Sequence, residues 1–259
     1  MIDGHVHLER GPLSKEYVLE FVKEAVNKGI THLQILDHTH RFIQFKPIYE
    51  PMMFIEPQRQ WLEACIKDDM REYLKLIDEM KKEDLPIEVT YGLEVCYQRS
   101  EEDILRDILS NYHFDFLVGS VHAIDHIAYD CKWSKEYLWD KYPTDEIYKK
   151  YYNEVFGLLE SDLFTQIGHP DTIKMFNYYP SYDLKETYET LADLAIKHHV
   201  KVENNTKIRY KYKHADLGLN DELLKICKQR GCEMITSSDA HEPAETGTLI
   251  KDIWKKTMY

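Results

Sequence analysis

Seven short apolar runs recur along this chain of 259 residues, and six of them end in a His, Glu or Asp. The six runs are Met1 to His7, His32 to His38, Ile87 to Glu94, Phe114 to His122, Phe164 to His169 and Glu233 to His241, and the seventh, Val200 to Asn205, ends in two asparagines. Helical patterns separate the runs, which predicts an α/β fold with a largely parallel sheet. Metal-ligand residue types at the carboxyl ends of successive strands indicate a barrel with a metal cluster at its mouth.

The composition favours one domain and argues against two classes of partner. A hydrophobic content of 43% is enough for one large core, so we expect a single domain over residues 1–259. The net charge of −13 disfavours nucleic acid, because that affinity depends on Lys and Arg that neutralise phosphates. No apolar stretch is long enough to span a bilayer, and the N-terminus lacks a basic segment followed by an apolar one. We therefore expect no membrane association.

The cysteines indicate where the protein works. There are five of them, an odd number, and no two form a C-x-x-C pair. Cysteines packed as small hydrophobic residues in a reducing compartment fit this pattern, so we expect a cytoplasmic protein. The sequence predicts no particular oligomeric state.

Helix boundaries can be predicted at several points. Ser14 is placed to cap a first helix that ends before Gly29, and Asn220 and Gly231 bracket another. A long helix is predicted from about Glu56 to Lys82, because apolar residues recur there at helical spacing.

Two connections are longer than a barrel requires. They run from Phe42 to Pro57 and from Ile124 to Thr144, and we expect them to form walls or lids of a substrate pocket. Aromatic or acidic side chains such as Tyr97, Asp125 and Trp133 could receive a cationic organic group there.

The first and last apolar runs carry paired metal-ligand types. Residues two apart in a strand point to the same side, so His5 and His7 project two imidazoles into one space. Asp239 and His241 repeat that spacing in the last run, which becomes the neighbour of the first when a barrel closes. The H-x-H pattern alone is weak in a chain with 13 histidines. Its combination with D-x-H and with ligand types at the intervening strand ends is a strong signal.

The intervening residues each have a structural alternative. Glu94 ends an apolar run, where an acidic side chain is rarely buried unless a metal or a cation pairs with it. His122, taken alone, is better explained as a core histidine, whereas a turn at His169 does not explain its imidazole. We expect Asp37 to hold the ring of His38 in one tautomer.

The other histidines divide into one open case and a structural group. His40 lies two residues beyond His38 and either faces the same cleft or lies past the end of the strand. We interpret the remaining histidines as structural or solvated: His32, His113, His126, His198, His199 and His214.

These motifs carry a family resemblance. The order D-G-H-V-H, L-D-H, G-L-E-V, G-S-V-H, G-H-P-D and S-S-D-A-H, from Asp3 to His241, resembles the PHP (polymerase and histidinol phosphatase) superfamily. The segment from Glu203 to Thr206 and the chain length resemble the stand-alone histidinol-phosphate phosphatases of histidine biosynthesis.

The resemblance implies a distorted (β/α)7 barrel, a single PHP-type domain and two or three divalent metal ions, Zn, Mn or Fe. One metal would be held by His5, His7, Glu94 and Asp239, a second by Glu94, His122 and His169, and a third by His38, His241 and a residue shortly after the first motif. At the usual position of that residue this chain has Pro12 and Leu13. Glu9 is the nearest substitute.

The resemblance also implies hydrolysis of a small phosphorylated substrate, a phosphomonoester, by metal-activated water. Glu94, Asp239 and His241 would be the catalytic residues at the metals. Arg10, Arg41 and Arg209 follow strand ends and are the candidates for phosphate contacts.

Three alternatives remain open at this stage. One is the same site acting on phosphotyrosine or a nucleotide. Another is an amidohydrolase-like barrel that cuts C–N bonds, although that class uses eight strands and a lone Asp at the last one. The third is a metal-binding regulatory domain without enzymatic activity.

Overall fold

Seven parallel strands form one sheet in which the spatial order follows the chain. The computed structural model describes residues 1–258, and the sheet order is β1-β2-β3-β4-β7-β8-β9. The strands are β1 (Ile2–His7), β2 (His32–Leu36), β3 (Glu88–Cys96), β4 (Phe116–Ser120), β7 (Gln166–Ile167), β8 (Lys201–Asn205) and β9 (Met234–Ser237). All six pairings between neighbours in this order are parallel. The α/β prediction is confirmed.

The first and last strands nearly close the sheet into a barrel. A single bridge joins Val6 to Ala240, and the amide of His7 donates to the carbonyl of Ala240 at 2.8 Å. The hydroxyl of Thr236 adds a bond of 2.6 Å to the carbonyl of Ile2. Because closure depends on so few bonds, the barrel is distorted, as the family resemblance predicts.

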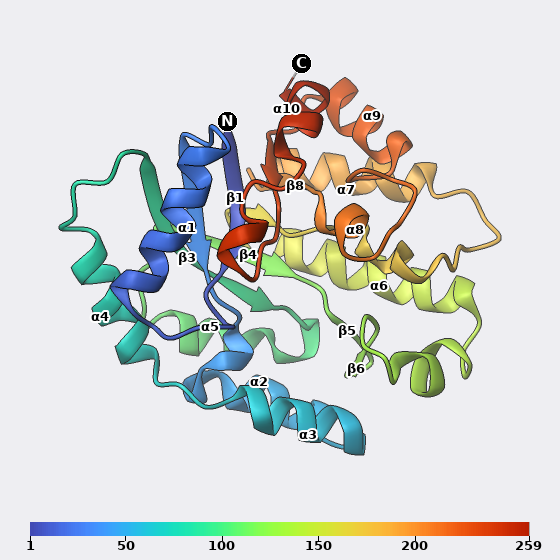
Figure 1. The fold of residues 1–259 in the computed structure, drawn as a ribbon. Helices are drawn as coiled ribbons and strands as arrows, with labels where there is room; N and C mark the ends of the chain where they lie inside the picture. The colour runs from blue at the N-terminus through green and yellow to red at the C-terminus, as the bar shows by residue number, and fades with distance from the viewer. Residues whose placement is uncertain (259) are drawn as a thin grey trace.

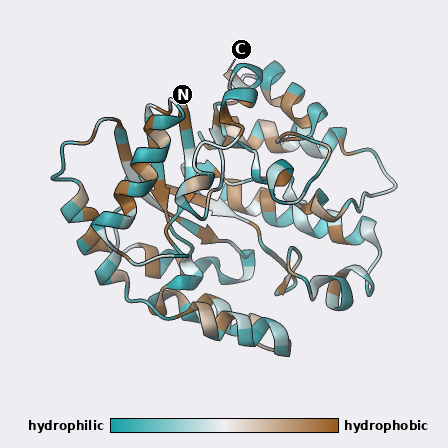
Figure 2. Cartoon of the chain, viewed as in Figure 1, coloured by the Kyte–Doolittle hydropathy of each residue, from teal (hydrophilic) through white to brown (hydrophobic). Residues whose placement is uncertain are grey.

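Helices surround the sheet and cover its outer face (Figure 1). They are α1 (Lys15–Asn27), α4 (Met70–Met80), α5 (Glu102–Leu109), α6 (Thr144–Glu160), α7 (Lys185–Lys197), α9 (Asp221–Arg230) and α10 (Ile250–Met258). In α1 the buried residues Val18, Phe21, Val22 and Ala25 recur at helical spacing, so one face packs on the core. Figure 2 shows the resulting pattern, with hydrophobic strands and helices that are hydrophilic on part of their surface. No helix within residues 1–258 is long and apolar enough to cross a membrane.

The predicted boundaries of α1 and α9 are confirmed. The Ser14 hydroxyl accepts from the amide of Tyr17 at 3.3 Å, and Gly29 follows α1 with a φ of +74°. Asn220 caps α9 and Gly231 ends it with a φ of +83°, a left-handed conformation that glycine adopts without a Cβ clash.

The predicted long helix from Glu56 to Lys82 is wrong, because the structure has two helices there. They are α3 (Glu56–Cys65) and α4, and the carboxylate of Asp69 caps the second by accepting from the amide of Arg71 at 2.8 Å. Between them the amides of Lys67 and Asp68 both donate to the carbonyl of Arg41 at 3.0 Å. Amides that bond to another segment cannot continue a helix, and apolar spacing does not reveal such a bond.

The long connections lie along the edge where the strands end. The connection after β2 contains α2 (Lys46–Tyr49) and leads into α3, while the connection after β4 contains the hairpin β5 (Ala123–Ile124) and β6 (Ile127–Ala128). Figure 1 shows α2, α3 and this hairpin on the same side of the barrel. A short helix, α8 (Lys207–Tyr210), follows β8.

Candidate metal centre

Glu94 lies at the middle of the cluster, and its side chain is 1% exposed. It stands near the carboxyl end of β3 and directs its two oxygens at different groups of histidines. Oε1 lies 3.0 Å from Nε2 of His169 and 3.5 Å from Nε2 of His122. These histidines come from the ends of β7 and β4, so the neighbouring strands bring them to one side of the carboxylate.

The other oxygen of Glu94 faces the first two strands. Oε2 lies 3.3 Å from Nε2 of His5, 3.4 Å from Nε2 of His7 and 2.7 Å from Nδ1 of His38. The Nε2 atoms of His5 and His7 are themselves 2.9 Å apart, as the alternation of side chains in β1 predicts. The Glu94 carboxylate therefore lies between two groups of histidine ring nitrogens.

The last strand adds Asp239 and His241 to the same group. Oδ1 of Asp239 lies 3.3 Å from Nε2 of His7 and 3.1 Å from Nε2 of His241. Both Asp239 and His169 have left-handed backbones, with φ values of +53° and +29°. Such conformations cost about 1–3 kcal/mol each in a residue other than glycine and are concentrated at functional sites.

Buried charges shift the protonation of these groups. Burial alone would lower the pKa of His5, but the carboxylates of Glu203 and Glu94 raise the pKa well above its ordinary value. Burial, with the neighbouring rings of His38 and His241, lowers the pKa of His7 well below that value. Although burial opposes it, the rings of His38 and His5 hold the pKa of the Glu94 carboxyl well below its ordinary range. Glu94 is therefore ionised and His7 neutral, which are the forms that bind metals, whereas His5 would release a proton when a cation binds.

The donor set fits divalent cations. Three ligand atoms converge within 4.8 Å of one another in each of the groups His5–His7–Asp239 and His38–Glu94–His122. Among the described residues, the buried Oε2 of Glu94 has no hydrogen-bond partner of good geometry, although three imidazoles surround it. Neutral imidazole and carboxylate are ligands that Zn, Mn and Fe share.

Side chains outside the predicted set hold this cluster in place. Glu203 in β8 contacts Nδ1 of His5 at 3.0 Å and accepts from the amide of His169 at 2.7 Å, and Asn205 donates to Asp239 at 3.1 Å. The sequence points to Glu203 only through the family resemblance. Its position in a buried run was a usable signal, the same one that identified Glu94.

Close packing explains why the G-H-P-D motif begins with a glycine. A Cβ on Gly168 would lie 2.3 Å from the hydroxyl oxygen of Ser120 and 3.0 Å from Cγ1 of the fully buried Val118. A glycine is needed here so that β7 can approach β4 and deliver His169 to Glu94.

Glu9 and His40 also reach the cluster. Glu9 contacts Nδ1 of His241, and its second oxygen lies 3.7 Å from Nε2 of His38 and 3.6 Å from Nε2 of His40. His40 lies past the end of β2, which ends at Leu36, and its ring nevertheless faces the cleft.

Arg41 and Asp37 pair with each other. Arg41 is 4% exposed and donates to Asp37 at 2.6 Å, to Asp68 at 2.5 Å and to the carbonyl of Gly11 at 3.1 Å. Asp37 accepts from Arg41 and from the backbone amide of His38 at 2.9 Å, so its carboxylate does not hold the imidazole as expected. This pair fixes the backbone that follows β2.

The other two predicted arginines also have partners away from the cavity described below. Arg10 pairs with Glu242 at 2.7 Å on the surface, and Arg209 donates to the carbonyl of His214 at 2.8 Å. Lys207, which the sequence analysis did not single out, lies at the cluster instead. Its ammonium donates to Asp239 at 2.8 Å and contacts His241.

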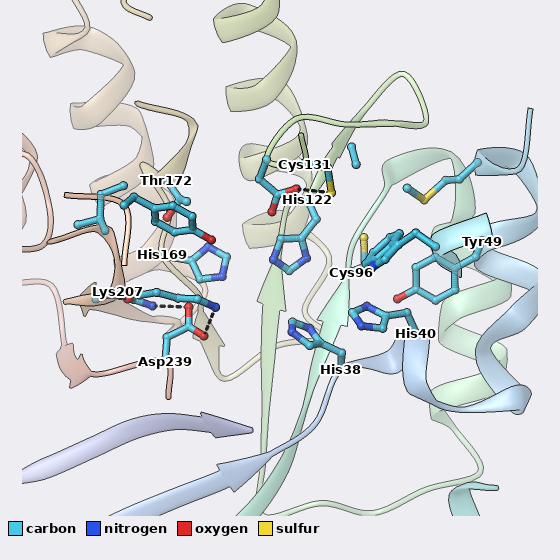
Figure 3. Close-up of a pocket in the computed structure, with 17 residues that line it drawn as sticks. His38, His40, Tyr49, Cys96, His122, Cys131, His169, Thr172, Lys207 and Asp239 are labelled. Carbon is cyan, nitrogen blue, oxygen red and sulfur yellow. Dashed lines mark hydrogen bonds and ion pairs between the residues drawn. The ribbon is translucent and has the colours of Figure 1, made fainter. Parts of the chain in front are cut away.

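A cavity of about 210 Å³ opens beside the cluster. In Figure 3, His122, His169 and Asp239 line one part of it, and His38 and His40 lie on the other side next to Tyr49. The two long connections form its walls, as predicted, and contribute Tyr49, Met52, Ala128, Asp130 and Cys131. Trp61, Thr172, Asn205, Ile208, Lys207, Tyr212 and Cys96 complete the lining.

The side chains expected to receive an organic cation lie elsewhere. The hydroxyl of Tyr97 donates to Glu102 at 2.6 Å, Asp125 pairs with Lys150 at 2.6 Å, and the ring of Trp133 packs on that of Trp61. Asp130 is the acidic side chain that reaches the cavity from the same connection.

Comparisons with known proteins agree with this geometry. The family model for the PHP domain matches residues 3–207. A Deinococcus radiodurans protein named "Probable histidinol-phosphatase" is 25% identical over 260 residues, covering 99% of this chain and 92% of that protein. The histidinol-phosphatase of Bacillus subtilis is 23% identical over 263 residues, covering 95% of each.

A solved structure shares the fold. It is the histidinol phosphate phosphatase of Lactococcus lactis subsp. lactis Il1403, complexed with zinc, L-histidinol and phosphate. The TM-score is 0.72 at 19% identity, and the match covers 99% of this chain and 92% of that one.

Proposed function

The chain belongs to the PHP domain family, and on that premise we propose that it is a metal-dependent phosphatase that hydrolyses histidinol phosphate in histidine biosynthesis. The observation that carries the proposal is Glu94, whose two oxygens face two separate groups of histidine nitrogens. Relatives named histidinol-phosphatases match this chain over 95% or more of its length and support the choice of substrate.

We assign the cluster as follows. Glu94 bridges two cation sites, one completed by His5, His7 and Asp239 and the other by His122 and His169. Bound divalent cations supply positive charge for the phosphoryl oxygens and activate water near neutral pH. Zn, Mn and Fe all suit such a set of imidazoles and carboxylates.

Lys207 is proposed to bind the phosphoryl group in place of the three arginines. Among the described residues that line the cavity it is the one Lys or Arg, and it lies on the wall that Asp239 forms. An ammonium there can donate to a phosphoryl oxygen, and its contact with Asp239 holds it at the cluster.

The far wall suits a small cationic alcohol. Histidinol carries an amino group and an imidazole, and Asp130 offers a carboxylate among the aromatic side chains of Tyr49, Trp61 and Tyr212. A cavity of about 210 Å³ favours a small leaving group over a nucleotide. Seven strands and a carboxylate bridge favour a phosphatase over an amidohydrolase-like enzyme.

We further propose that residues 1–259 form one PHP-type domain that works in the cytoplasm. The family match ends at residue 207, yet β9 and Asp239 complete the barrel and the cluster, so the site needs the residues beyond it. All five cysteines are free, which suits a reducing compartment.

The test is phosphate release from a panel of phosphomonoesters by metal-free protein reloaded with Zn, Mn or Fe. We expect histidinol phosphate to have the highest kcat/KM, with phosphotyrosine and nucleotides lower by about 100-fold or more. Release from none of the esters, or a preference for phosphotyrosine, would contradict the proposal.

A further inference from the structure

We propose that this chain has a second binding pocket, away from the metal cluster, that takes a small primary amine with an apolar body. Residues of α6, α7 and the first turn of α9 line the pocket, and α7 packs against both of the other helices (Figure 1). Its volume is about 270 Å³, and none of its described lining residues belongs to the cavity beside the cluster. The inference goes beyond the proposed function and does not depend on it.

Five tyrosines form much of the wall. They come from α6, from the connection before α7 and from α7 itself: Tyr148, Tyr152, Tyr179, Tyr182 and Tyr188. A tyrosine ring offers apolar area to the body of a ligand, and its π face attracts an ammonium. The ring of Tyr182 already has such a neighbour, because the ammonium of the exposed Lys149 lies 5.3 Å from its centroid.

The positive groups of the pocket are already paired. The ammonium of Lys174 donates to two carboxylates and one backbone carbonyl at distances of 2.6–3.0 Å, which uses its three hydrogens. At the start of α9 the amide of Asn220 donates to Asp171 at 2.7 Å, and the amide of Glu222 donates to the side chain of Asn220 at 2.9 Å. An anion would have to displace these bonds, so the pocket does not favour one.

Carboxylate oxygens remain available to a ligand. Asp171 ends the G-H-P-D motif, and the cluster does not use it. Within residues 1–258, every hydrogen bond to its buried side chain goes to Oδ2, which leaves Oδ1. Asp183 accepts from the amide of Lys185 at 2.8 Å with one of its oxygens, and Glu222 is exposed at the rim. Three carboxylates and one ammonium give the pocket a negative charge, which favours a cation.

A primary ammonium fits these groups better than a quaternary one. It has three N–H donors, and Oδ1 of Asp171 can accept one of them. Tyr152 is 2% exposed, and its buried hydroxyl has no hydrogen-bond partner of good geometry within residues 1–258. A buried polar group without a partner costs free energy, so a donor supplied by a ligand is favourable.

Calorimetric titration of the metal-loaded protein tests the pocket. The probe is phenethylamine, and 2-phenylethanol has the same body without the positive charge. Asp183→Asn/Glu222→Gln removes two carboxylates from the wall, and the amide introduced at position 183 keeps an oxygen for the Lys185 amide. The matched control is Glu186→Gln/Asp221→Asn, which removes two charges from the first turns of α7 and α9 at exposed positions that do not line the pocket.

We expect phenethylamine to bind the wild type with a Kd below about 1 mM, and 2-phenylethanol to bind at least about tenfold more weakly. Asp183→Asn/Glu222→Gln should weaken phenethylamine binding by about fivefold, since exposed charge pairs contribute modestly. The matched control should keep the wild-type affinity. Tyr182→Leu, which keeps apolar bulk without a π face, should weaken binding by about two- to fivefold.

Two further measurements make the test specific. Unchanged thermal unfolding would show that the variants fold. Asp130→Asn removes the carboxylate of the cavity beside the cluster, and this variant should still bind phenethylamine.

Several results would overturn the pocket. They are no detectable binding, equal affinity for phenethylamine and 2-phenylethanol, or equal affinity of the wild type and folded Asp183→Asn/Glu222→Gln. Binding that is lost in Asp130→Asn and kept in Asp183→Asn/Glu222→Gln would place the amine beside the cluster instead. Phosphate release enters none of these results, so the proposed function succeeds or fails separately.

Discussion

Oε1 of Glu94 lies 3.0 Å from Nε2 of His169, although 75 positions separate the two residues in the chain. The contact joins the end of β3 to the end of β7, two strands that both flank β4. It places a carboxylate oxygen on the side of the cluster away from His5 and His7, which lets one side chain serve two sites.

Glu94→Gln should therefore remove both sites at once. The amide keeps the shape of the side chain and loses the negative charge, so we expect kcat for histidinol phosphate to fall by about a thousandfold. Metal content should fall with it. Glu88→Gln, at the exposed start of the same strand, is the control and should behave as the wild type. Near wild-type kcat in Glu94→Gln would show that the bridge is not catalytic.

Lys207→Met should weaken the handling of the phosphoryl group. A hydrogen bond to a charged partner contributes about 1.5–3 kcal/mol, so kcat/KM should fall by about 10- to 150-fold with metal content unchanged. Lys213→Met, on an exposed residue of the same connection, is the matched control. Steady-state kinetics on both variants decide the assignment, and equal kcat/KM values in the two would remove Lys207 from it.

Asp130→Asn should change substrate choice rather than catalysis. If the carboxylate pairs with the cationic alcohol, KM for histidinol phosphate should rise by about tenfold. For p-nitrophenyl phosphate, whose leaving group carries no positive charge, KM should not change. A parallel rise for both esters would place Asp130 in a general structural role.

His214 gives a prediction about pH that is independent of metals. It is 3% exposed, and its Nδ1 accepts from the amide of Asp216 at 3.0 Å, which requires a neutral ring. Burial first, and then the Lys174 ammonium, hold the pKa of His214 below 6.5. As the pH falls, the unfolded chain therefore protonates His214 before the folded protein does. The stabilising contribution of the neutral His214 ring to the free energy of unfolding is thus fully present above pH 6.5 and is lost as the pH falls below 6.5.

Urea unfolding between about pH 7.5 and about pH 5 measures this contribution. In His214→Gln the fall of the unfolding free energy with acidification should be smaller than in the wild type, while His113→Asn keeps the wild-type slope. An identical slope in His214→Gln would mean that the neutral ring contributes nothing to stability.

The strand-end residues could be predicted because their rule is local. Side chains alternate along a strand, and parallel strands end at one edge, so His5, His7, Glu94 and Asp239 had to meet if the runs were strands. Glu203 follows the same rule, because it is fully buried in β8. The reasoning that placed Glu94 at the cluster therefore applies to Glu203 as well.

Other features depend on bonds between distant segments. The break between α3 and α4 follows from bonds to the carbonyl of Arg41, and no spacing within the helices records it. Likewise Arg209 and Lys207 are two residues apart in α8, and the direction of that one turn sends Lys207 to Asp239 and Arg209 to the carbonyl of His214. The sequence shows that Lys and Arg side chains lie near the mouth of the barrel, but it does not show which of them enters the cavity.

If Glu94 bridges two cation sites, a cation binds at each of its two oxygens. The most direct measurement is an anomalous difference map from crystals of the protein loaded with Zn or Mn. We expect a separate peak at each oxygen, within about 2.0–2.2 Å of it as for zinc and a carboxylate. A map with no peak at Glu94, or with metal at sites that exclude His7 and His169, would contradict it.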